Sequence, residues 1–392
     1  MDRLDIKDDR AGKVVSIPGG LWAFVPHHLP PWIESSPRFM QAVAEAGSAL
    51  SRVDGAMGMF PAGATPISPL LWREASASAR IEGAGVTCAQ AVQTELECAP
   101  EGSELDEAAA CRAAMQLGLD HLPTLSFGVE LVKLMHAEAM RGAHWAYVSP
   151  GRFREVQTFI GVRRKRLSTA SYVPPPWDYI ADLMADWERF ARDNRELPPL
   201  VQTAILHAQF ELIHPFMDGN GKVGRMAMNL FLLSCGRLNH PVLLLSPYFE
   251  RTRPEYYQAL RGVSHEGLWE QWVMYFLRGV TEECERLLVV AKRLNALREG
   301  TRERLLTRRV SGTVLHLVDT LLDNPYTDRQ LAASKLGVTP RTAGAAITIL
   351  EHIGLLERVA GPVRGQRFRA PEIIDALHVG VQTDVSWMSV SS

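Results

Sequence analysis

Two apolar helical stripes joined by a short loop constrain this chain more than any other feature. One stripe recurs with helical spacing over residues 201–212, and the other over residues 223–230, as in helices that bury one face. Pro215 disfavours helical backbone geometry at His214, so the first helix should end there. The sequence therefore predicts an amphipathic helix, a tight loop at residues 218–221 that contains two glycines, and a second helix that starts at the loop.

The loop is suited to binding a phosphate group. Gly219, Asn220 and Gly221 would begin the second helix, where unpaired N–H groups and the positive end of the helix dipole attract an anion. The two glycines let an oxygen approach the backbone without meeting a Cβ. Lys222 and Arg225 lie about one turn apart on one helix face, so both can reach back to the anion. An ordinary tight turn would explain the glycines but not the two cations.

Two further side chains beside the loop supply a metal ligand and a base. Asp218 is a hard oxygen ligand of the kind that holds a phosphate-bound Mg²⁺ ion. His214 is the only side chain between residues 214 and 225 that titrates near neutral pH, which makes it the candidate general base. The combination indicates chemistry on a nucleotide phosphate.

The whole run from His214 to Arg225 resembles the signature of the Fic family, His-x-Phe-x-Asp/Glu-Gly-Asn-Gly-Arg/Lys-x-x-Arg. The resemblance implies a protein adenylyltransferase, which transfers AMP from ATP to a Ser, Thr or Tyr hydroxyl of a target protein, and we expect it to modify itself. It assigns His214 as the base, Asp218 as the Mg²⁺ ligand, and the loop with Lys222 and Arg225 as the phosphate site. Lys222 stands where arginine is commoner and lacks the bidentate fork of a guanidinium.

Residues 150–161 resemble the flap that precedes the signature in Fic proteins. The β-prone stretch Val156–Ile160 predicts a β-hairpin flap, which in the family aligns the target segment by strand addition. Ile160 and Gly161, at the end of this stretch, are expected to contact the nucleotide. The continuation at residues 162–168 carries four cations in a row. A solvated loop is the favoured interpretation, and selection of acidic targets or nucleic acid is the alternative.

Two adjacent tyrosines, Tyr256 and Tyr257, stand where the family places a pair that forms the adenine pocket. The resemblance therefore predicts that both contact the nucleotide. Taken alone, such a pair is more typical of partly buried surface aromatics.

A second motif lies upstream, at residues 78–83. Gly83 should end a helix in the left-handed conformation. Glu82 would then face the negative end of the helix dipole, which predicts a cationic partner. The segment is similar to the Fic inhibitory motif, in which the glutamate pairs with the second arginine of the signature, here Arg225, and prevents productive binding of ATP. We therefore expect Ser78, Glu82 and Gly83 to form an inhibitory element.

Composition sets the class of protein. The chain has 392 residues, of which 46% are hydrophobic, enough for two or three packed domains. Its net charge is −2, so the chain as a whole does not indicate binding to nucleic acid or to an anionic membrane. Residues 1–15 do not resemble a secretory signal, and the longest apolar run, at residues 226–235, is too short to span a bilayer. These features predict a cytoplasmic enzyme with no membrane partner.

The cysteines are odd in number and widely spaced, which predicts reduced and mostly buried thiols, at Cys88, Cys98, Cys111, Cys235 and Cys284.

The expected fold class is mainly α, with a Fic-type helical core, the flap as its main strand element and a C-terminal winged helix-turn-helix domain. We expect an N-terminal region with the inhibitory helix at residues 1–110, a catalytic domain at 111–295 and the winged-helix domain at 300–392. Helical periodicity is clear at two further segments, residues 179–193 and 268–288. A charged helix is expected around residues 293–309 and leads into the winged-helix domain.

The winged-helix expectation depends on the order of elements after residue 311. Helices are predicted at residues 312–322, 328–336 and 339–353, followed by two wing strands at 355–359 and 365–368 around Gly361-Pro362. Arginines on the third helix and the wing would suit phosphate contacts, namely Arg341, Arg358, Arg364, Arg367 and Arg369. The third helix offers little for reading bases, so DNA binding and a protein-interaction or dimerisation module both stay open.

Three alternatives to AMP transfer also stay open. A Fic protein that removes AMP would use Glu82 to orient water. A Fic-type phosphotransferase would transfer a different part of the nucleotide. A nucleotide-sensing transcriptional regulator would bind DNA in a manner that depends on ATP but not on His214.

Overall fold

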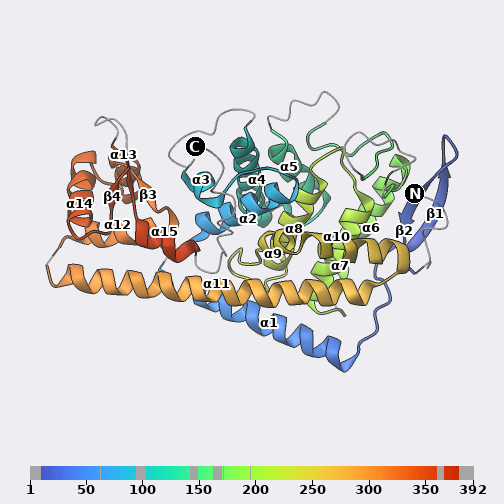
Figure 1. Ribbon diagram of the computed structural model, residues 1–392, viewed down its shortest axis with the longest axis horizontal. Coiled ribbons are helices and arrows are strands. Elements are labelled where there is room, and N and C mark those ends of the chain that lie inside the picture. Colours follow the sequence, from blue (N-terminus) through green and yellow to red (C-terminus); the bar gives the residue numbers. More distant parts are fainter. Residues whose placement is uncertain are drawn as a thin grey trace, which may run out of the picture. The chain divides into compact units, whose positions relative to one another are not determined.

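The computed structural model describes residues 10–61, 63–93, 103–141, 149–161, 170, 172–194, 196–308, 310–359 and 366–378 (Figure 1). Contacts between residues divide the chain into two units. The first comprises residues 1–51 and 70–283, and the second comprises residues 52–69 and 284–392. The expected fold class holds in its coarse form, because the described residues are mostly helical with small antiparallel sheets.

The first unit is built from the following elements: β1 (Gly12–Ile17), β2 (Leu21–Pro26), α2 (Ile67–Ile81), α3 (Cys88–Gln93), α4 (Glu104–Leu125), α5 (Val129–Ala139), the short 3₁₀ helix η3 (Trp177–Tyr179), α6 (Ile180–Asp193), α7 (Pro199–Ile213), α8 (Asn220–Ser234), α9 (Ser246–Arg251) and α10 (Arg253–Glu266). Three helices, α1 (Pro37–Met57), α2 and α11 (Trp269–Leu306), contain a boundary between the units. The first three residues of α2 belong to the second unit.

The N-terminal segment forms a hairpin that the sequence interpretation missed. β1 and β2 pair antiparallel from Gly12 with Pro26 to Ile17 with Leu21. The turn between them contains Gly19 and Gly20 at φ 89° and 71°, the positive values that a tight hairpin turn needs. The expectation that the flap would be the main strand element is therefore wrong.

Helix α7 lies at the centre of the first unit. It packs against α6, α8, α10 and β2. Even its polar residues Gln202, Thr203 and His207 are buried, so the predicted amphipathic helix is instead enclosed on nearly all sides. Two tryptophans hydrogen-bond its carbonyls, because Trp187 Nε1 donates to Leu206 and Trp272 Nε1 donates to Ala204. Helix α7 is thus held within the core by its neighbours.

Helix α11 is one continuous helix of 38 residues. The sequence interpretation divided it into a helix at residues 268–288 and a charged helix at residues 293–309, and that division is wrong. Residues 289–292 contain no glycine or proline, so nothing local interrupts the backbone hydrogen bonds.

The second unit contains α12 (Gly312–Asp323), β3 (Tyr326–Thr327), α13 (Arg329–Leu336), α14 (Pro340–His352), β4 (Glu357–Arg358), β5 (Phe368–Arg369) and α15 (Pro371–His378). Its three strands form an antiparallel sheet in the order β3-β5-β4.

Local sequence sets the boundaries of the helices in this unit. Asp328 accepts from two amides at the start of α13, and Thr339 accepts from Thr342 N at the start of α14, as N-caps do. Gly337 ends α13 at φ 63°, the left-handed cap that glycine favours. The two wing strands are shorter than predicted, and β3 and α15 were not predicted at all. The predicted wing turn at Gly361-Pro362 lies outside the described residues.

Two findings bear on the expectations from composition. No helix of the described residues is long and apolar enough to cross a membrane. Among the described residues, Cys88, Cys111, Cys235 and Cys284 form no disulfide bond. Cys111 and Cys284 are buried, and Cys88 and Cys235 are half-buried. Cys98 lies outside the described residues.

Candidate active site

The loop between α7 and α8 has the predicted form. Helix α7 ends at Ile213, and His214 adopts a left-handed conformation with φ 50°. Gly219, at φ 74°, is the N-cap of α8. The Asn220 side chain closes the loop, because its Oδ1 accepts from Phe216 N at 2.8 Å and its Nδ2 donates to Phe216 O at 2.9 Å. Asn220 was expected to contact the nucleotide. Its side-chain amide instead holds the loop in shape, so that only its backbone could contact an anion.

Asp218 is exposed at the rim of this loop. One of its oxygens, Oδ1, accepts from Gly219 N at 2.7 Å. The described residues contain no group of three or more His, Cys, Asp or Glu side chains that could hold a metal ion. A single exposed carboxylate still fits Mg²⁺, which proteins often bind through one or two carboxylates together with substrate phosphates.

His214 is half-buried beside the loop. Burial, followed by the neighbouring charge of Arg154, lowers the pKa of its imidazole to about 4, although Glu82 and the Glu211 carbonyl act in the opposite direction. The imidazole is therefore neutral at pH 7. A neutral imidazole can accept a proton, as a general base must.

Arg225 is enclosed and points to the inhibitory motif. Its guanidinium is 2% exposed, and its Nη2 donates to Glu82 Oε1 at 2.8 Å while its Nε donates to Ser78 Oγ at 3.0 Å. Glu82 follows the end of α2 at Ile81, and Gly83 adopts φ 107°. Burial by itself would raise the pKa of Glu82, but the Arg225 charge and hydrogen bond lower it overall. The cationic partner predicted for Glu82 is present.

The Glu82 carboxylate occupies the space above the glycine loop. A Cβ added at Gly221 would lie 2.5 Å from Glu82 Oε1 and 2.8 Å from Arg225 Nη1. The same carboxylate interacts electrostatically with Lys222 and His214. A carboxylate in this position would repel an anion bound at the loop.

Lys222 has a carboxylate partner that sequence reasoning missed. Its ammonium forms an ion pair with Glu107, in the first turn of α4. Lys222 is 5% exposed. Burial opposes its charge, but neighbouring groups that include Glu107 raise the pKa of Lys222 overall, so it stays charged. Acidic residues are common in the first turn of any helix, so no local signal distinguishes Glu107.

Helix α2 is fixed by polar contacts along its length. The buried carboxylate of Glu74 accepts from the backbone N–H and the hydroxyl of Ser246 at the start of α9. Nearer its C-terminus, Arg80 donates to both oxygens of Glu250 at 2.6 and 2.8 Å. These contacts hold the helix that presents Glu82.

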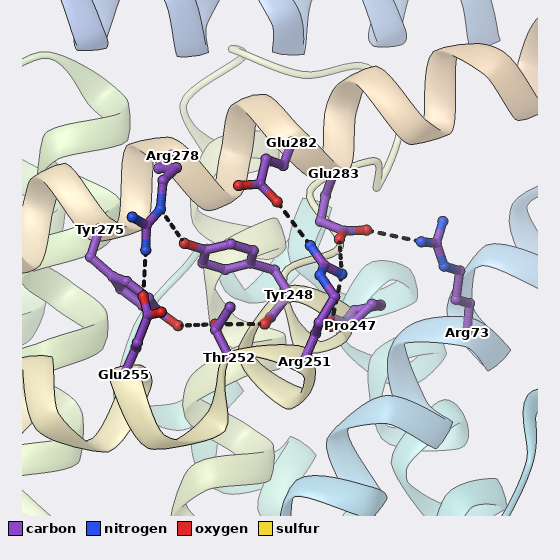
Figure 2. Close-up of polar contacts among 10 residues, drawn as sticks. All are labelled: Arg73, Pro247, Tyr248, Arg251, Thr252, Glu255, Tyr275, Arg278, Glu282 and Glu283. Atoms are coloured by element: carbon purple, nitrogen blue, oxygen red, sulfur yellow. Dashed lines mark hydrogen bonds and ion pairs between the residues drawn. The ribbon is translucent and has the colours of Figure 1, made fainter. Parts of the chain in front are cut away.

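Figure 2 shows that α2 is also connected to α9 and α11 through a shared carboxylate. Glu283 of α11 accepts from Arg73 of α2 and from Arg251 of α9, each at 2.9 Å. Arg251 also donates to Glu282 at 3.0 Å. Because Glu283 is 4% exposed, this shared carboxylate is screened little by solvent.

The flap differs from the prediction. Among the described residues, Val156–Phe159 form no strand, and Ile160 makes a single antiparallel bridge with Tyr172. Side chains take the carbonyls that a partner strand would otherwise use, since Gln157 Nε2 donates to the Thr158 carbonyl at 3.1 Å and Arg154 donates to that of Val156. Val156, Phe159 and Ile160 are exposed. The basic continuation at residues 162–168 lies outside the described residues.

The tyrosine pair is divided between core and surface. Tyr256 is 1% exposed, and its hydroxyl lies 2.9 Å from His207 Nε2. Its ring stacks on Phe249 with a centroid distance of 4.5 Å. Tyr257 is 45% exposed. In this arrangement Tyr257 is the ring of the pair that a base can reach.

Three more residues around the loop were missed. His136 stacks on Phe216 and its Nε2 lies 3.0 Å from the Asp218 carbonyl. Glu211 lies one turn before His214, and burial raises the pKa of its carboxyl to about 7. Arg154 donates to the His214 carbonyl at 2.9 Å. Of these three, Arg154 alone lay within a motif that the sequence interpretation had singled out, the flap segment at residues 150–161.

Comparison with known proteins agrees with this geometry. The Fic/DOC family model matches residues 126–232, which include α7, the loop and most of α8. The chain carries a Fic/DOC domain. A second model, for the N-terminal part of the Fic/DOC family, matches residues 40–120. Both carboxylates that pair with cations of the Fic domain, Glu82 and Glu107, lie in that second match.

The chain is similar to part of the length of several named proteins. A probable protein adenylyltransferase of Aquifex aeolicus is 35% identical over 92 residues, which are 24% of this chain and 26% of that protein. A protein adenylyltransferase of Caenorhabditis elegans is 28% identical over 147 residues, which are 37% of this chain and 26% of that protein. The chain thus matches about a quarter of the length of each.

Solved structures share the fold. A Fic family protein from Desulfovibrio desulfuricans G20 superposes with a TM-score of 0.56 and 21% identity, over 87% of this chain and 98% of that one. Fic-1 of C. elegans superposes with a TM-score of 0.50 and 20% identity, over 65% of this chain and 74% of that one. The helical Fic fold is therefore common to all three.

Proposed function

We propose that this protein is an adenylyltransferase that transfers AMP from ATP to a hydroxyl of a target protein. The observation that carries the proposal is the arrangement at the α7–α8 loop, where a neutral imidazole, an anion-binding helix start and two buried cations converge. The names of the relatives support the same activity. The target protein would present a Ser, Thr or Tyr hydroxyl on an accessible segment.

In the proposed reaction, His214 takes the proton of the target hydroxyl as its oxygen attacks the α-phosphorus of ATP. A new O–P bond forms, the bond from the α-phosphorus to the bridging oxygen breaks, and pyrophosphate leaves. The Gly219–Gly221 amides and the freed side chains of Lys222 and Arg225 would stabilise the charge on the phosphates. Asp218 would hold Mg²⁺, which supplies charge neutralisation when bound.

We further propose that the described arrangement is inhibited. Glu82 pairs with Arg225 and Glu107 pairs with Lys222, so both cations expected to bind phosphate are neutralised by carboxylates of the N-terminal region. Activity would then require Glu82 to separate from Arg225 and Glu107 to separate from Lys222. The contacts of Glu74, Arg80 and Arg73 would stabilise the inhibited arrangement.

Intact-mass analysis after incubation with ATP and Mg²⁺ tests the activity. A gain of one AMP unit on the Glu82→Gly chain would support self-modification by AMP transfer. A gain of a phosphate unit would instead favour the phosphotransferase alternative. Loss of AMP from a previously modified chain, without any gain from ATP, would favour the enzyme that removes AMP.

The Glu107 restraint yields a prediction of modest size. In the Glu82→Gly background, Glu107→Gln should tighten MgATP binding about two- to fivefold, because Glu107 is 43% exposed and pairs of this kind contribute up to about 1 kcal/mol. Isothermal titration calorimetry measures the effect. Asp120→Asn removes the same charge from an exposed site on α4 and should leave affinity unchanged. Equal affinities of the Glu107 variant and its parent would refute a restraint at Lys222.

The pKa of His214 predicts an unusual pH dependence. Because that pKa is lowered to about 4, the imidazole stays neutral as pH falls through the usual histidine range, and protonates only below it. NMR titration of ring-labelled histidines, with His214→Ala for assignment, should show this resonance titrating near pH 4. A midpoint near the ordinary histidine value of about 6.5 would contradict the buried environment.

For the second unit, we propose a winged-helix fold. Its support is the element order α12, β3, α13, α14, β4 and β5 with a three-stranded sheet. DNA binding draws little support from the described arginines of the wing. Arg358 is paired with Glu351, and Arg369 with Glu357, while Arg364 lies outside the described residues.

We therefore favour a protein-interaction module over a DNA reader. The full chain should give no salt-sensitive shift of duplex DNA in an electrophoretic assay at low salt. A shift that weakens steeply as salt rises would instead indicate phosphate contacts, and dependence of that shift on ATP would favour the regulator alternative.

A further inference from the structure

Arg154 binds the end of α7 from one side. Its Nε donates to the His214 carbonyl at 2.9 Å and its Nη2 approaches the Ile213 carbonyl at 3.5 Å. Its own backbone N–H donates to the Pro215 carbonyl at 2.9 Å. Three consecutive carbonyls, at the point where α7 turns into the loop, thus accept from one residue.

The other donors of the same guanidinium hold the flap stretch and the segment that returns from it. Nη1 of Arg154 donates to the Val156 carbonyl at 3.0 Å, and Nη2 donates to the Pro175 carbonyl at 2.6 Å. The return segment has its own tie to α7, because the Tyr172 hydroxyl donates to the Leu212 carbonyl at 2.7 Å. Tyr172 is also the residue that bridges Ile160.

The Arg154 guanidinium is buried, so it must keep its hydrogen bonds to the main chain. Arg154 is 3% exposed, and each acceptor in its described contacts is a main-chain carbonyl. Burying a charge is costly unless its hydrogen bonds are satisfied, and the negative end of the α7 dipole offsets part of that cost. Burial accordingly lowers the pKa of Arg154 to about 10, and the group remains charged at pH 7.

We infer that Arg154 is a positioning residue that fixes the distance between the His214 imidazole and the flap stretch Val156–Ile160, beside which a target segment would lie. The inference rests on the proposed function for the identity of the substrate, but the juxtaposition itself is independent of it. A guanidinium suits the task because its planar fork fixes several donors at once, whereas a lysine ammonium is a single flexible point. The loop that would bind phosphate is closed separately, by Asn220 and Phe216.

Two measurements on Arg154→Lys, in the Glu82→Gly background, separate positioning from general destabilisation. Hydrogen exchange followed by mass spectrometry should show faster exchange in residues 156–161 and in residues 206–214 together. The dissociation constant for MgATP, from calorimetry, should stay within about threefold, while AMP transfer to the chain falls about 10²-fold, the order expected for misplacement by about 1 Å. Arg152→Lys, at an exposed arginine two residues upstream, serves as the matched control.

The outcomes are distinguishable from failure of the proposed function. If the Glu82→Gly parent binds MgATP but transfers no AMP, the adenylyltransferase proposal fails, and the exchange data still decide the role of Arg154. Faster exchange in only one of the two segments, or in neither, overturns the inference. So does a loss of MgATP affinity in proportion to the loss of transfer, because that would indicate a general collapse of the site.

Discussion

Replacing His214 with alanine should reduce AMP transfer by about 10²- to 10⁴-fold, the contribution typical of a positioned general base. The expectation follows from the neutral imidazole beside the anion-binding loop, with its pKa lowered to about 4 by burial and by Arg154. Transfer of α-labelled AMP from ATP to the chain measures the effect, best in the active Glu82→Gly background. MgATP affinity should change little, because the loop amides are unaltered.

A conservative variant sharpens this test. His214→Gln keeps a polar side chain but cannot accept a proton near neutral pH, so it should be as inactive as His214→Ala. Thermal unfolding of both variants checks that the fold remains stable when the side chain at this left-handed position, φ 50°, is replaced. Full transfer by either variant, with normal folding, would show that His214 is not the general base of the reaction.

The Glu82→Gly substitution should raise AMP transfer by about ten- to a hundredfold. The Glu82 carboxylate lies 2.8 Å from Arg225 Nη2 and 2.5 Å from the point where a Cβ added at Gly221 would lie, and there it would repel a bound triphosphate. A tenfold gain corresponds to about 1.4 kcal/mol of preference for the inhibited arrangement. Since 39% of the Glu82 side chain is exposed, solvent screening places the gain nearer tenfold.

Ser78→Ala provides a control for this gain. It removes the hydroxyl that accepts from Arg225 Nε but keeps the Glu82 carboxylate, so it should activate the protein less than Glu82→Gly does. Label transfer and MgATP affinity are measured for the three proteins side by side. Equal activity in the wild type and Glu82→Gly would refute inhibition by Glu82 and leave the ion pair as a purely structural contact.

The sequence by itself determined the features that depend on neighbouring residues. Pro215 and the glycines at 219 and 221 set the end of α7, the loop and the start of α8, because backbone conformation there is decided within a few residues. Capping residues likewise set the helices of the second unit. Where local signals were absent, as between residues 288 and 293, the predicted break in α11 was wrong.

Tertiary structure brings together charged groups that lie far apart in the sequence. Arg225 and Glu82 are 143 residues apart, and Lys222 and Glu107 are 115 apart. The first pairing followed from a family resemblance, and the second had no signal, because an acidic first turn is ordinary in any helix. Packing also decided that α7 is enclosed on nearly all sides and that Tyr256 is buried. A one-dimensional pattern records which side chains are apolar, but their burial depends on how many other elements close over them.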